Sequence, residues 1–308
     1  MASAEPKLAK PLLAAILART LPGEIDGFGK DAQAQAVEFM LATAAKRASG
    51  KSNVAVDTFA DASGRLAMRV ALINDDMPFL VDSVAAALAT ANVAIERLIH
   101  PVVDVERDAS GMLTALNEKR GSTGKRESFI YVETSRIDAK ERRALADSLA
   151  AVLEDVRCAV TDWRKMQGAM SEDADSLPEG EGAALMRWFM DGAMTVLAHE
   201  RIMGDGEREA RLGLARSSDT ALLSEESVVR ARAFFAEGGQ APLILKSSRV
   251  STVHRSVQLD ILVVPVRDGD KIKGLGVTGG LWTSNALATP PERIPLLRTQ
   301  LSDLLTRY

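Results

Sequence analysis

The sequence predicts an α+β protein made of two successive modules, and two observations carry this prediction. First, the stretch from Leu66 to Val105 changes from a period of two to a helical period and back again, which indicates strand, helix and strand. That order is the first half of a βαββαβ sandwich. Second, the strands and helices expected after residue 183 do not alternate strictly, which favours an antiparallel α+β arrangement over a doubly wound parallel sheet.

The first strand and the first helix of the opening module are joined by a short acidic turn. Residues 66–73 alternate as a half-buried strand does. Pro78 suits the first turn of a helix, because it fixes φ and lacks only an N–H that this turn leaves unpaired. From Leu80 the apolar residues recur at helical spacing, and Asn92 stands where a left-handed C-cap would end the helix. Residues 93–105 then form the second predicted strand.

The opening module continues with a further strand and a further helix. Residues 128–133 alternate as a strand, and Glu127 and Glu133, which lie on one face of it, are expected to be solvated. Asp138 is placed to N-cap a helix with an apolar face that extends to residue 156. No clear strand follows this helix. We therefore expect a βαββα(β) sandwich that is either incomplete or completed by a partner.

Composition along the chain predicts four segments. Residues 1–53 contain two short amphipathic helices and a small, polar linker, and residues 54–167 hold the opening module. The segment 168–182 is acidic and contains Pro178 and several glycines, so it is the best candidate for an acidic linker between domains. Residues 183–308 are expected to form a second antiparallel α+β domain, for which a PAS-like sheet is one possible form.

Length, charge and cysteine content exclude several classes of protein. A chain of 308 residues fits two domains of about 100–200 residues each. The net charge of −4 gives no support to a nucleic-acid or membrane-surface partner. No apolar run approaches the roughly 18 residues that a membrane span needs. Cys158 is the one cysteine, which excludes an internal disulfide and fits a reducing, cytoplasmic location.

One motif invites a nucleotide-binding interpretation and does not satisfy it. Residues 274–279 match the G-x-G-x-x-G pattern, in which the third glycine opens a helix that receives a pyrophosphate. Residues 280–283 read as strand instead, so we expect a glycine-rich strand. His100, His199 and His254 lack metal-ligand spacing. The sequence therefore predicts no metal site, no cofactor in this segment and no catalytic residue.

Several stretches carry a resemblance to a known family. Residues 75–83 read DDMPFLVDS, and they are followed by HPVV at 100–103, ESFIYVE at 127–133, LKSSRVSTVHR at 245–255 and GLWTS at 280–284. With these stretches the chain resembles the N-terminal region of the large bacterial NAD-dependent glutamate dehydrogenases. The resemblance covers most of the chain from about Asn74, far more than a short motif would. It implies ferredoxin-like, ACT-type modules that precede a catalytic domain.

The resemblance implies a non-catalytic segment for allosteric regulation and assembly in amino-acid metabolism. The whole oxidoreductase would deaminate L-glutamate to 2-oxoglutarate and ammonia with NAD as its cofactor, by chemistry that lies beyond Tyr308. The implied partners are the rest of the polypeptide, further subunits of a homo-oligomer and a small amino-acid effector. Two alternatives stay open: a freestanding ACT-type amino-acid sensor, and a pure oligomerisation scaffold whose exposed strand edges pair between subunits.

Two candidate binding sites follow. ACT modules that bind amino acids carry D-x-P-G-L at the strand–helix turn, where Phe79 here replaces the glycine that lets a ligand approach the backbone. Alternatively, the acidic residues of the turn cap the helix and complement its dipole. A second, basic group either holds a phosphate or carboxylate or pairs with acidic surface groups. The turn comprises Asn74, Asp75, Asp76, Met77, Pro78 and Phe79, and the basic group comprises Lys246, Arg249, His254 and Arg255.

Overall fold

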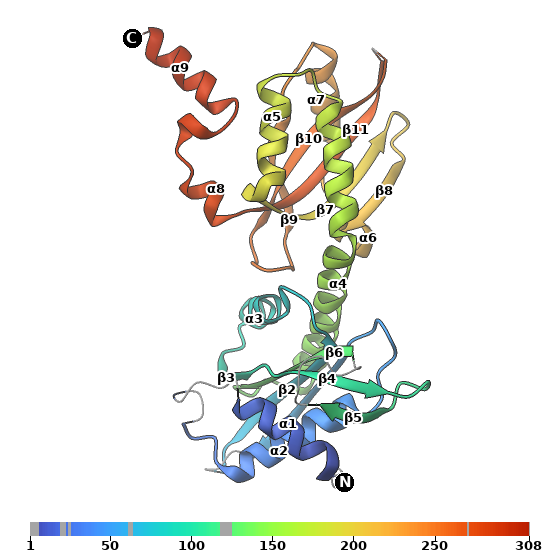
Figure 1. The fold of residues 1–308 in the computed structure, drawn as a ribbon, viewed down its shortest axis with the longest axis vertical. Helices are drawn as coiled ribbons and strands as arrows, with labels where there is room; N and C mark the ends of the chain where they lie inside the picture. The colour runs from blue at the N-terminus through green and yellow to red at the C-terminus, as the bar shows by residue number, and fades with distance from the viewer. Residues whose placement is uncertain are drawn as a thin grey trace. The chain divides into compact units, whose positions relative to one another are not determined.

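The fold is described by a computed structural model in which residues 6–18, 23, 26–60, 64–117, 125–269 and 271–307 are placed. The chain divides into two compact units, residues 1–156 (unit 1) and residues 157–308 (unit 2). Each unit is an antiparallel sheet with helices packed on it (Figure 1). The predicted mixed α/β class with antiparallel sheets is therefore confirmed.

The sheet of unit 1 has six strands, paired in the order β1-β2-β6-β4-β5, with β3 also paired to β6. β3 and β4 meet β6 in a single register, since Ile99 lies opposite Tyr131 and Val102 opposite Ser128. They are thus two halves of the predicted second strand, interrupted at residues 100–101. The strands are β1 (Asn53–Ala60), β2 (Leu66–Asp75), β3 (Ile95–Ile99), β4 (Val102–Arg107), β5 (Leu113–Asn117) and β6 (Lys125–Thr134).

The edge of this sheet beside β2 is occupied by β1, a strand that sequence patterning does not identify. β1 pairs antiparallel with β2 along its whole length, from Asn53 opposite Ile73 to Ala60 opposite Leu66. Its residues are nearly all half-buried, so no alternation of buried and exposed positions marks it. The edge that was expected to stay open, or to await a partner, is filled from upstream in the same chain.

Helices cover both faces of the unit 1 sheet, with α1 and α2 on one face and α3 and the start of α4 on the other (Figure 1). Ile73 and Phe129 belong to the apolar core beneath α1 and α2. The neighbouring residues Leu72 and Ile130 point to the opposite face of the sheet and are equally buried, so both faces of the sheet are covered. These helices are α1 (Pro6–Leu17), α2 (Lys30–Ala44), α3 (Leu80–Thr90) and α4 (Ala139–Asp175).

The ends of α3 and α4 carry the signals expected from the sequence. Asn92 follows the last turn of α3 with a φ of 57°, the left-handed conformation predicted for it. Asp138 Oδ1 accepts hydrogen bonds of 2.8 Å from the N–H groups of Lys140 and Glu141. Glu141 Oε2 accepts one of 3.1 Å from the N–H of Asp138, which completes a capping box.

α4 is much longer than its sequence suggests, with 37 residues. Met166, Met170 and Ala174 continue the buried stripe of the helix at intervals of four. This stripe outweighs Gly168 and the acidic residues that follow it. The segment expected to be an acidic linker, residues 168–182, is therefore helical as far as Asp175, and the division between the compact units falls inside α4.

Unit 2 is a five-stranded antiparallel sheet in the order β8-β7-β11-β10-β9. The G-x-G-x-x-G residues 274–279 lie within β11 and pair with β7 on one side and β10 on the other, which confirms the glycine-rich strand. Within the described residues no helix is both long and apolar enough to cross a membrane. The strands are β7 (Met194–Met203), β8 (Arg208–Gly213), β9 (Leu243–Val250), β10 (Gln258–Asp268) and β11 (Lys271–Trp282).

The helices of unit 2 surround a second apolar core. α4 and α5 meet β7 and β10 in this core, where Met170, Met186 and Leu262 are buried together. α9 follows a single 3-10 turn at Pro291–Arg293. The helices are α5 (Glu181–Trp188), α6 (Leu214–Ser217), α7 (Glu225–Ala236), α8 (Ser284–Ala288) and α9 (Leu297–Arg307), with a π-helical turn, η2 (Phe189–Ala193), after α5.

Candidate functional site

A cleft of about 610 Å³ opens in unit 1 where the end of α2, the β4–β5 turn and the start of β6 meet. A volume of this size falls in the range of small-ligand sites. Charged residues of both signs line it. The lining consists of Arg47, Ala48, Ser49, Asp75, Val105, Glu106, Arg107, Asp108, Ala109, Ser110, Gly111, Lys125 and Glu127.

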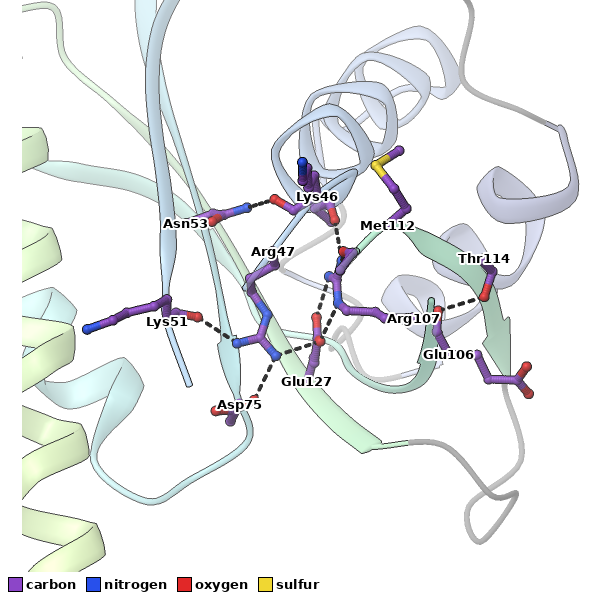
Figure 2. Close-up of polar contacts among 12 residues, drawn as sticks. Lys46, Arg47, Lys51, Asn53, Asp75, Glu106, Arg107, Met112, Thr114 and Glu127 are labelled. Atoms are coloured by element: carbon purple, nitrogen blue, oxygen red, sulfur yellow. Dashed lines mark hydrogen bonds and ion pairs between the residues drawn. The ribbon is translucent and has the colours of Figure 1, made fainter. Parts of the chain in front are cut away.

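Four of these residues form a connected ion network, which we call the Arg47 network: Arg47, Asp75, Arg107 and Glu127 (Figure 2). Arg47 Nη2 donates to Asp75 Oδ1 and to Glu127 Oε1, each at 2.6 Å. Arg107 donates two hydrogen bonds to Glu127, from Nε to Oε1 at 2.7 Å and from Nη2 to Oε2 at 2.8 Å. Only 1% of the Glu127 side chain and 3% of the Arg47 side chain are exposed. Glu127 is thus a buried anion between two cations.

The Arg47 network also binds backbone groups from separate parts of unit 1. Arg107 Nη1 donates to the carbonyls of Ala44, at the end of α2, and of Gly111, in the β4–β5 turn, at 2.8 and 2.9 Å. Gly111 accepts a further bond of 3.0 Å from the N–H of Arg47. Gly111 has a φ of 86°, and a Cβ at this position would collide with the Arg47 carbonyl. The network therefore holds the C-terminal end of α2 against the sheet.

The electrostatics of the Arg47 network favour full ionisation of its buried arginine. Burial acts to lower the pKa of Arg47, but its hydrogen bonds and ion pairs with Glu127 and Asp75 outweigh burial and raise that pKa. Arg47 Nε is buried and has no hydrogen-bond partner among the described residues. Because both carboxylates already accept bonds from arginine, the network is suited to binding and to structural support rather than to proton transfer.

The acidic turn predicted as a ligand site is tied to the sheet. Asp75 joins the Arg47 network, as described above, and Asn74 is buried with 1% exposure. Asp76 Oδ2 pairs with Arg126 Nη2 at 3.0 Å, and its Oδ1 accepts a 3.0 Å bond from the Ser128 hydroxyl. The N-cap of α3 is Phe79, and it makes no side-chain cap hydrogen bond. The contacts described here tie Asp75 and Asp76 to Arg47, Arg126 and Ser128, and their effect on the dipole of α3 stays a prediction.

Phe79, which stands where the ACT pattern has glycine, adopts a left-handed backbone. Its φ of 70° and ψ of −1° lie in the left-handed region, which an aromatic residue rarely adopts. Phe79 and Met77 are half-buried, and Pro78 is exposed. Ligand binding at residues 74–79 stays a prediction.

The predicted basic group is divided among different contacts in unit 2. Lys246 Nζ pairs with Asp260 Oδ1 at 2.7 Å. Arg249 Nη1 donates to the carbonyl of residue 220 at 3.3 Å, and Arg255 Nη2 donates to that of residue 282 at 2.7 Å. His254 has a left-handed φ of 68°. Anion binding by this group stays a prediction.

The sequence analysis missed the partners of Glu127. Glu127 was expected to be solvated, yet it is buried. Its two arginine partners, Arg47 and Arg107, lie 80 and 20 residues away along the chain, so the local sequence does not reveal them. Glu133 also has a partner, Arg97 Nε, at 3.1 Å and only 15% of it is exposed. The available signal was weak: an acidic residue at each end of an otherwise apolar strand requires cations from elsewhere in the fold if the strand is central.

A second buried polar pair, Asp173 and His199 in unit 2, also escaped the sequence analysis. Their side chains are 3% and 0% exposed, and Asp173 Oδ2 lies 3.7 Å from His199 Nδ1. His199 Nδ1 is also 3.1 Å from the hydroxyl of Thr278. Among the described residues no group of three or more His, Cys, Asp or Glu side chains is arranged to hold a metal ion.

Comparison with known proteins places these features in context. A family described as "Glutamate dehydrogenase, ACT1 domain" matches residues 12–149. The NAD-specific glutamate dehydrogenase of Pseudomonas aeruginosa is 29% identical over 272 residues, which cover 77% of this chain and 16% of that protein. The NAD-specific glutamate dehydrogenase of Halomonas elongata is 24% identical over 262 residues, with the same coverages of 77% and 16%. The chain thus spans about a sixth of the length of these relatives.

Solved structures resemble the whole chain only remotely. An RNA-binding light-oxygen-voltage receptor aligns with 94% of this chain and 90% of its own, at 11% identity and a TM-score of 0.21. A putative uncharacterized protein from Mycobacterium tuberculosis aligns with 81% of this chain and 52% of its own, at 12% identity and a TM-score of 0.18. Both scores are too low to carry an argument about fold or function.

Proposed function

We propose that this chain is the ACT1-containing N-terminal region of an NAD-specific glutamate dehydrogenase, a non-catalytic part of the enzyme that serves regulation and assembly. The observation that carries the proposal is the ACT1 match over residues 12–149. The position of the G-x-G-x-x-G residues inside β11 supports it, since this motif lacks the helix that would receive a pyrophosphate.

In this proposal, NAD and the residues that transfer hydride from L-glutamate belong to other parts of the full enzyme. The partners are the remainder of the polypeptide and further subunits, in a cytoplasmic homo-oligomer. Unit 1 supports a ferredoxin-like, ACT-type assignment through its antiparallel sheet, with α3 placed between β2 and β3 in the chain. Unit 2 supports a PAS-like assignment only through its five-stranded antiparallel sheet.

An activity assay on the purified chain tests the non-catalytic role. We expect no NADH production from L-glutamate above that of a mock purification, under conditions in which a full-length relative is active. Formation of NADH by the chain itself would overturn the proposal. In the full-length enzyme, a change that unfolds unit 1 should alter the oligomeric mass or the response to effectors. An unchanged mass together with unchanged kinetics would count against both regulation and assembly.

An amino-acid sensor is the second candidate function, and the left-handed backbone at Phe79 favours it. The backbone at Phe79 is in the left-handed conformation that glycine adopts most readily, although the phenyl ring takes up space beside it. We expect weak or no binding of free amino acids for this reason. Calorimetry with glutamate, aspartate and a panel of other amino acids measures it. Micromolar binding that is lost in Asp75→Ala and Asp76→Ala, but kept in Asp82→Ala, would identify the turn as a sensor.

A further inference from the structure

The C-terminal turns of α4 are held on the unit 2 sheet by polar contacts as well as by the apolar core. The carboxyl group of Asp173 lies against β11, where a Cβ added at Gly276 would meet its Oδ2 at 2.5 Å. The same oxygen is 3.7 Å from His199 Nδ1 on β7. One turn later, the hydroxyl of Ser176 donates to the carbonyl of Pro265 on β10 at 2.8 Å. The Asp173 carboxyl group thus sits between the helix and two strands.

This carboxyl group is poorly provided with partners for a negative charge. Asp173 Oδ2 and His199 Nε2 are both buried and have no hydrogen-bond partner among the described residues. The cation that faces Asp173 is Arg201 on β7, with its Nη2 3.6 Å from Oδ1, but Arg201 also pairs with Glu172 on α4 at 2.7 Å. From β11, Thr278 faces the imidazole and carries no charge. A buried carboxylate with a distant, shared cation is costly to ionise.

The directions of titration agree with this geometry. Burial raises the pKa of Asp173 to about 7, against the ordinary value of 3.8, and the nearby Glu172 raises it further while Arg201 lowers it. Burial lowers the pKa of His199 to about 4, against the ordinary value of 6.5, and Arg201 lowers it too. Both side chains are therefore uncharged over a shared range of pH.

We propose that Asp173 and His199 form a proton-operated latch, which holds the last turns of α4 on β7 and β11 while both side chains are uncharged and loosens when Asp173 loses its proton. In the closed state, the carboxyl O–H faces imidazole Nδ1 and no net charge is buried. Release of the Asp173 proton to water leaves an anion next to Glu172. Uptake of a proton by His199 places a cation next to Arg201. Each event adds an unfavourable charge to a dry site.

The signs of the two shifts set the range over which the latch is closed. The pKa of Asp173 is raised, so its contribution to stability is complete below 3.8 and is lost as pH rises through about 7. The pKa of His199 is lowered, so its contribution is present above 6.5 and is lost as pH falls through about 4. Both side chains are uncharged between about pH 4 and pH 7. Over most of this range the two contributions change in opposite directions and nearly cancel, so the net loosening occurs above about pH 6.5. α4 contributes residues to both compact units, so the pH-dependent contact involves a helix that the two units share.

Hydrogen exchange of the intact chain tests the latch without reference to enzymatic activity. Exchange of peptides from residues 166–177 is compared at pH 5.5 and pH 8.5 after correction for the intrinsic rate. We expect these peptides to exchange about threefold faster at pH 8.5, because loss of the Asp173 contribution, about thirtyfold by itself, is largely offset by the gain of the His199 contribution as pH rises through 6.5. Asp173→Asn, which has the same shape and cannot ionise, should reverse this dependence and give up to about tenfold slower exchange at pH 8.5, because His199 alone then titrates. Asp175→Asn, at a 66% exposed side chain, is the matched control and should keep the dependence of the unaltered chain.

Two results would overturn the latch. One is a pH dependence in Asp173→Asn equal to that of the unaltered chain. The other needs no variant: carbonyl-carbon NMR of the unaltered chain should show the Asp173 carboxyl titrating near pH 7. A midpoint below about 5, close to that of an ordinary aspartate, would show that the Asp173 carboxyl is already ionised at neutral pH and holds no proton to release.

Discussion

The two units each bury a cluster of ionisable side chains, and the two clusters treat charge differently. In the Arg47 network of unit 1, opposite charges lie 2.6–2.8 Å apart, and every carboxylate accepts a bond from a guanidinium. In unit 2, the groups nearest to the Asp173 carboxyl lie at 3.6–3.7 Å. Burial is similar, with exposures of 1–3% for Glu127 and Arg47 and 0–3% for His199 and Asp173. The distance to a partner therefore decides whether a buried group keeps its charge.

This difference separates a fixed support from a responsive one. Protonation or deprotonation would not stabilise the Arg47 network in unit 1, because every charge in it is matched by a bonded opposite charge. The pair in unit 2 avoids burying charge by holding a proton, so its hold on α4 depends on pH. Four sets of substitutions test this difference.

The largest effect is expected for Glu127→Gln, which removes the anion between Arg47 and Arg107. Arg47 would keep Asp75 as its carboxylate partner, but Arg107 would lose its carboxylate partner in a largely buried site, so the free energy of unfolding should fall by about 3–5 kcal/mol. Urea unfolding at neutral pH measures it. Glu96→Gln is the control, because Glu96 is 38% exposed and pairs with the 65% exposed Arg65. Its loss should cost no more than about 1 kcal/mol, and equal costs would show that the network is not a support.

The next effect is a pH dependence that appears only when one member of the unit 2 pair is removed. Between about pH 4 and pH 6.5 the contributions of Asp173 and His199 have opposite slopes and cancel. In Asp173→Asn the free energy of unfolding should therefore rise with pH by up to about 1.4 kcal/mol per unit relative to the unaltered chain. In His199→Gln it should fall as pH rises. Parallel profiles for all three proteins would contradict the assigned shifts.

A smaller loss is expected for Gly276→Ala, which places a methyl group 2.5 Å from the Asp173 carboxyl. Crowding of a close-packed site of this kind costs about 1–3 kcal/mol. Gly168→Ala is a suitable contrast, since Gly168 is exposed in α4 and no atom lies within 4 Å of the added Cβ. It should stabilise the chain by about 0.4–1 kcal/mol. Denaturant midpoints at pH 6 measure both changes, and a neutral Gly276→Ala would mean that α4 can shift away from β11.

The smallest effect is expected for Phe79→Gly, in the turn that supplies Asp75 to the Arg47 network. Glycine relieves a left-handed backbone that costs an ordinary residue about 1–2 kcal/mol. It also removes the contacts of a half-buried ring and loosens the unfolded chain. The net change in the free energy of unfolding should stay within about 1 kcal/mol. A loss above about 2 kcal/mol on thermal or urea unfolding would show that the ring, rather than the ion pairs, holds the turn in place.

Features fixed by neighbouring residues could be predicted from the sequence, whereas features fixed by distant contacts could not. The left-handed Asn92, the Asp138 cap and the strand at residues 274–279 depend on local patterns and were predicted correctly. β1 was missed because both of its faces are half-buried. The length of α4 was underestimated because Gly168 suggests a helix break, whereas the buried Met166 and Met170 on either side of it continue the apolar face.

The candidate site shows the same division. The acidic turn at residues 74–79 could be located from its composition, but its bonds to Arg47 and Arg126 depend on β-sheet register and on the end of α2. Nothing near Asp173 in the sequence distinguishes it from the exposed acidic residues around it. Its burial results from the packing of α4 on β11. The sequence feature that reflects this packing is the glycine at position 276, far from Asp173 along the chain.

The position of β1 has a consequence for the path of the chain. In a βαββαβ sandwich the second helix must be followed by a loop that returns the chain to the sheet edge beside the first strand. Here β1 already occupies that edge before β2 is reached. The chain that leaves unit 1 through α4 has no place to return to, and no reversing loop is needed. Because β1 fills this edge, α4 does not have to end within unit 1. It continues without interruption, and its last turns belong to the apolar core of unit 2.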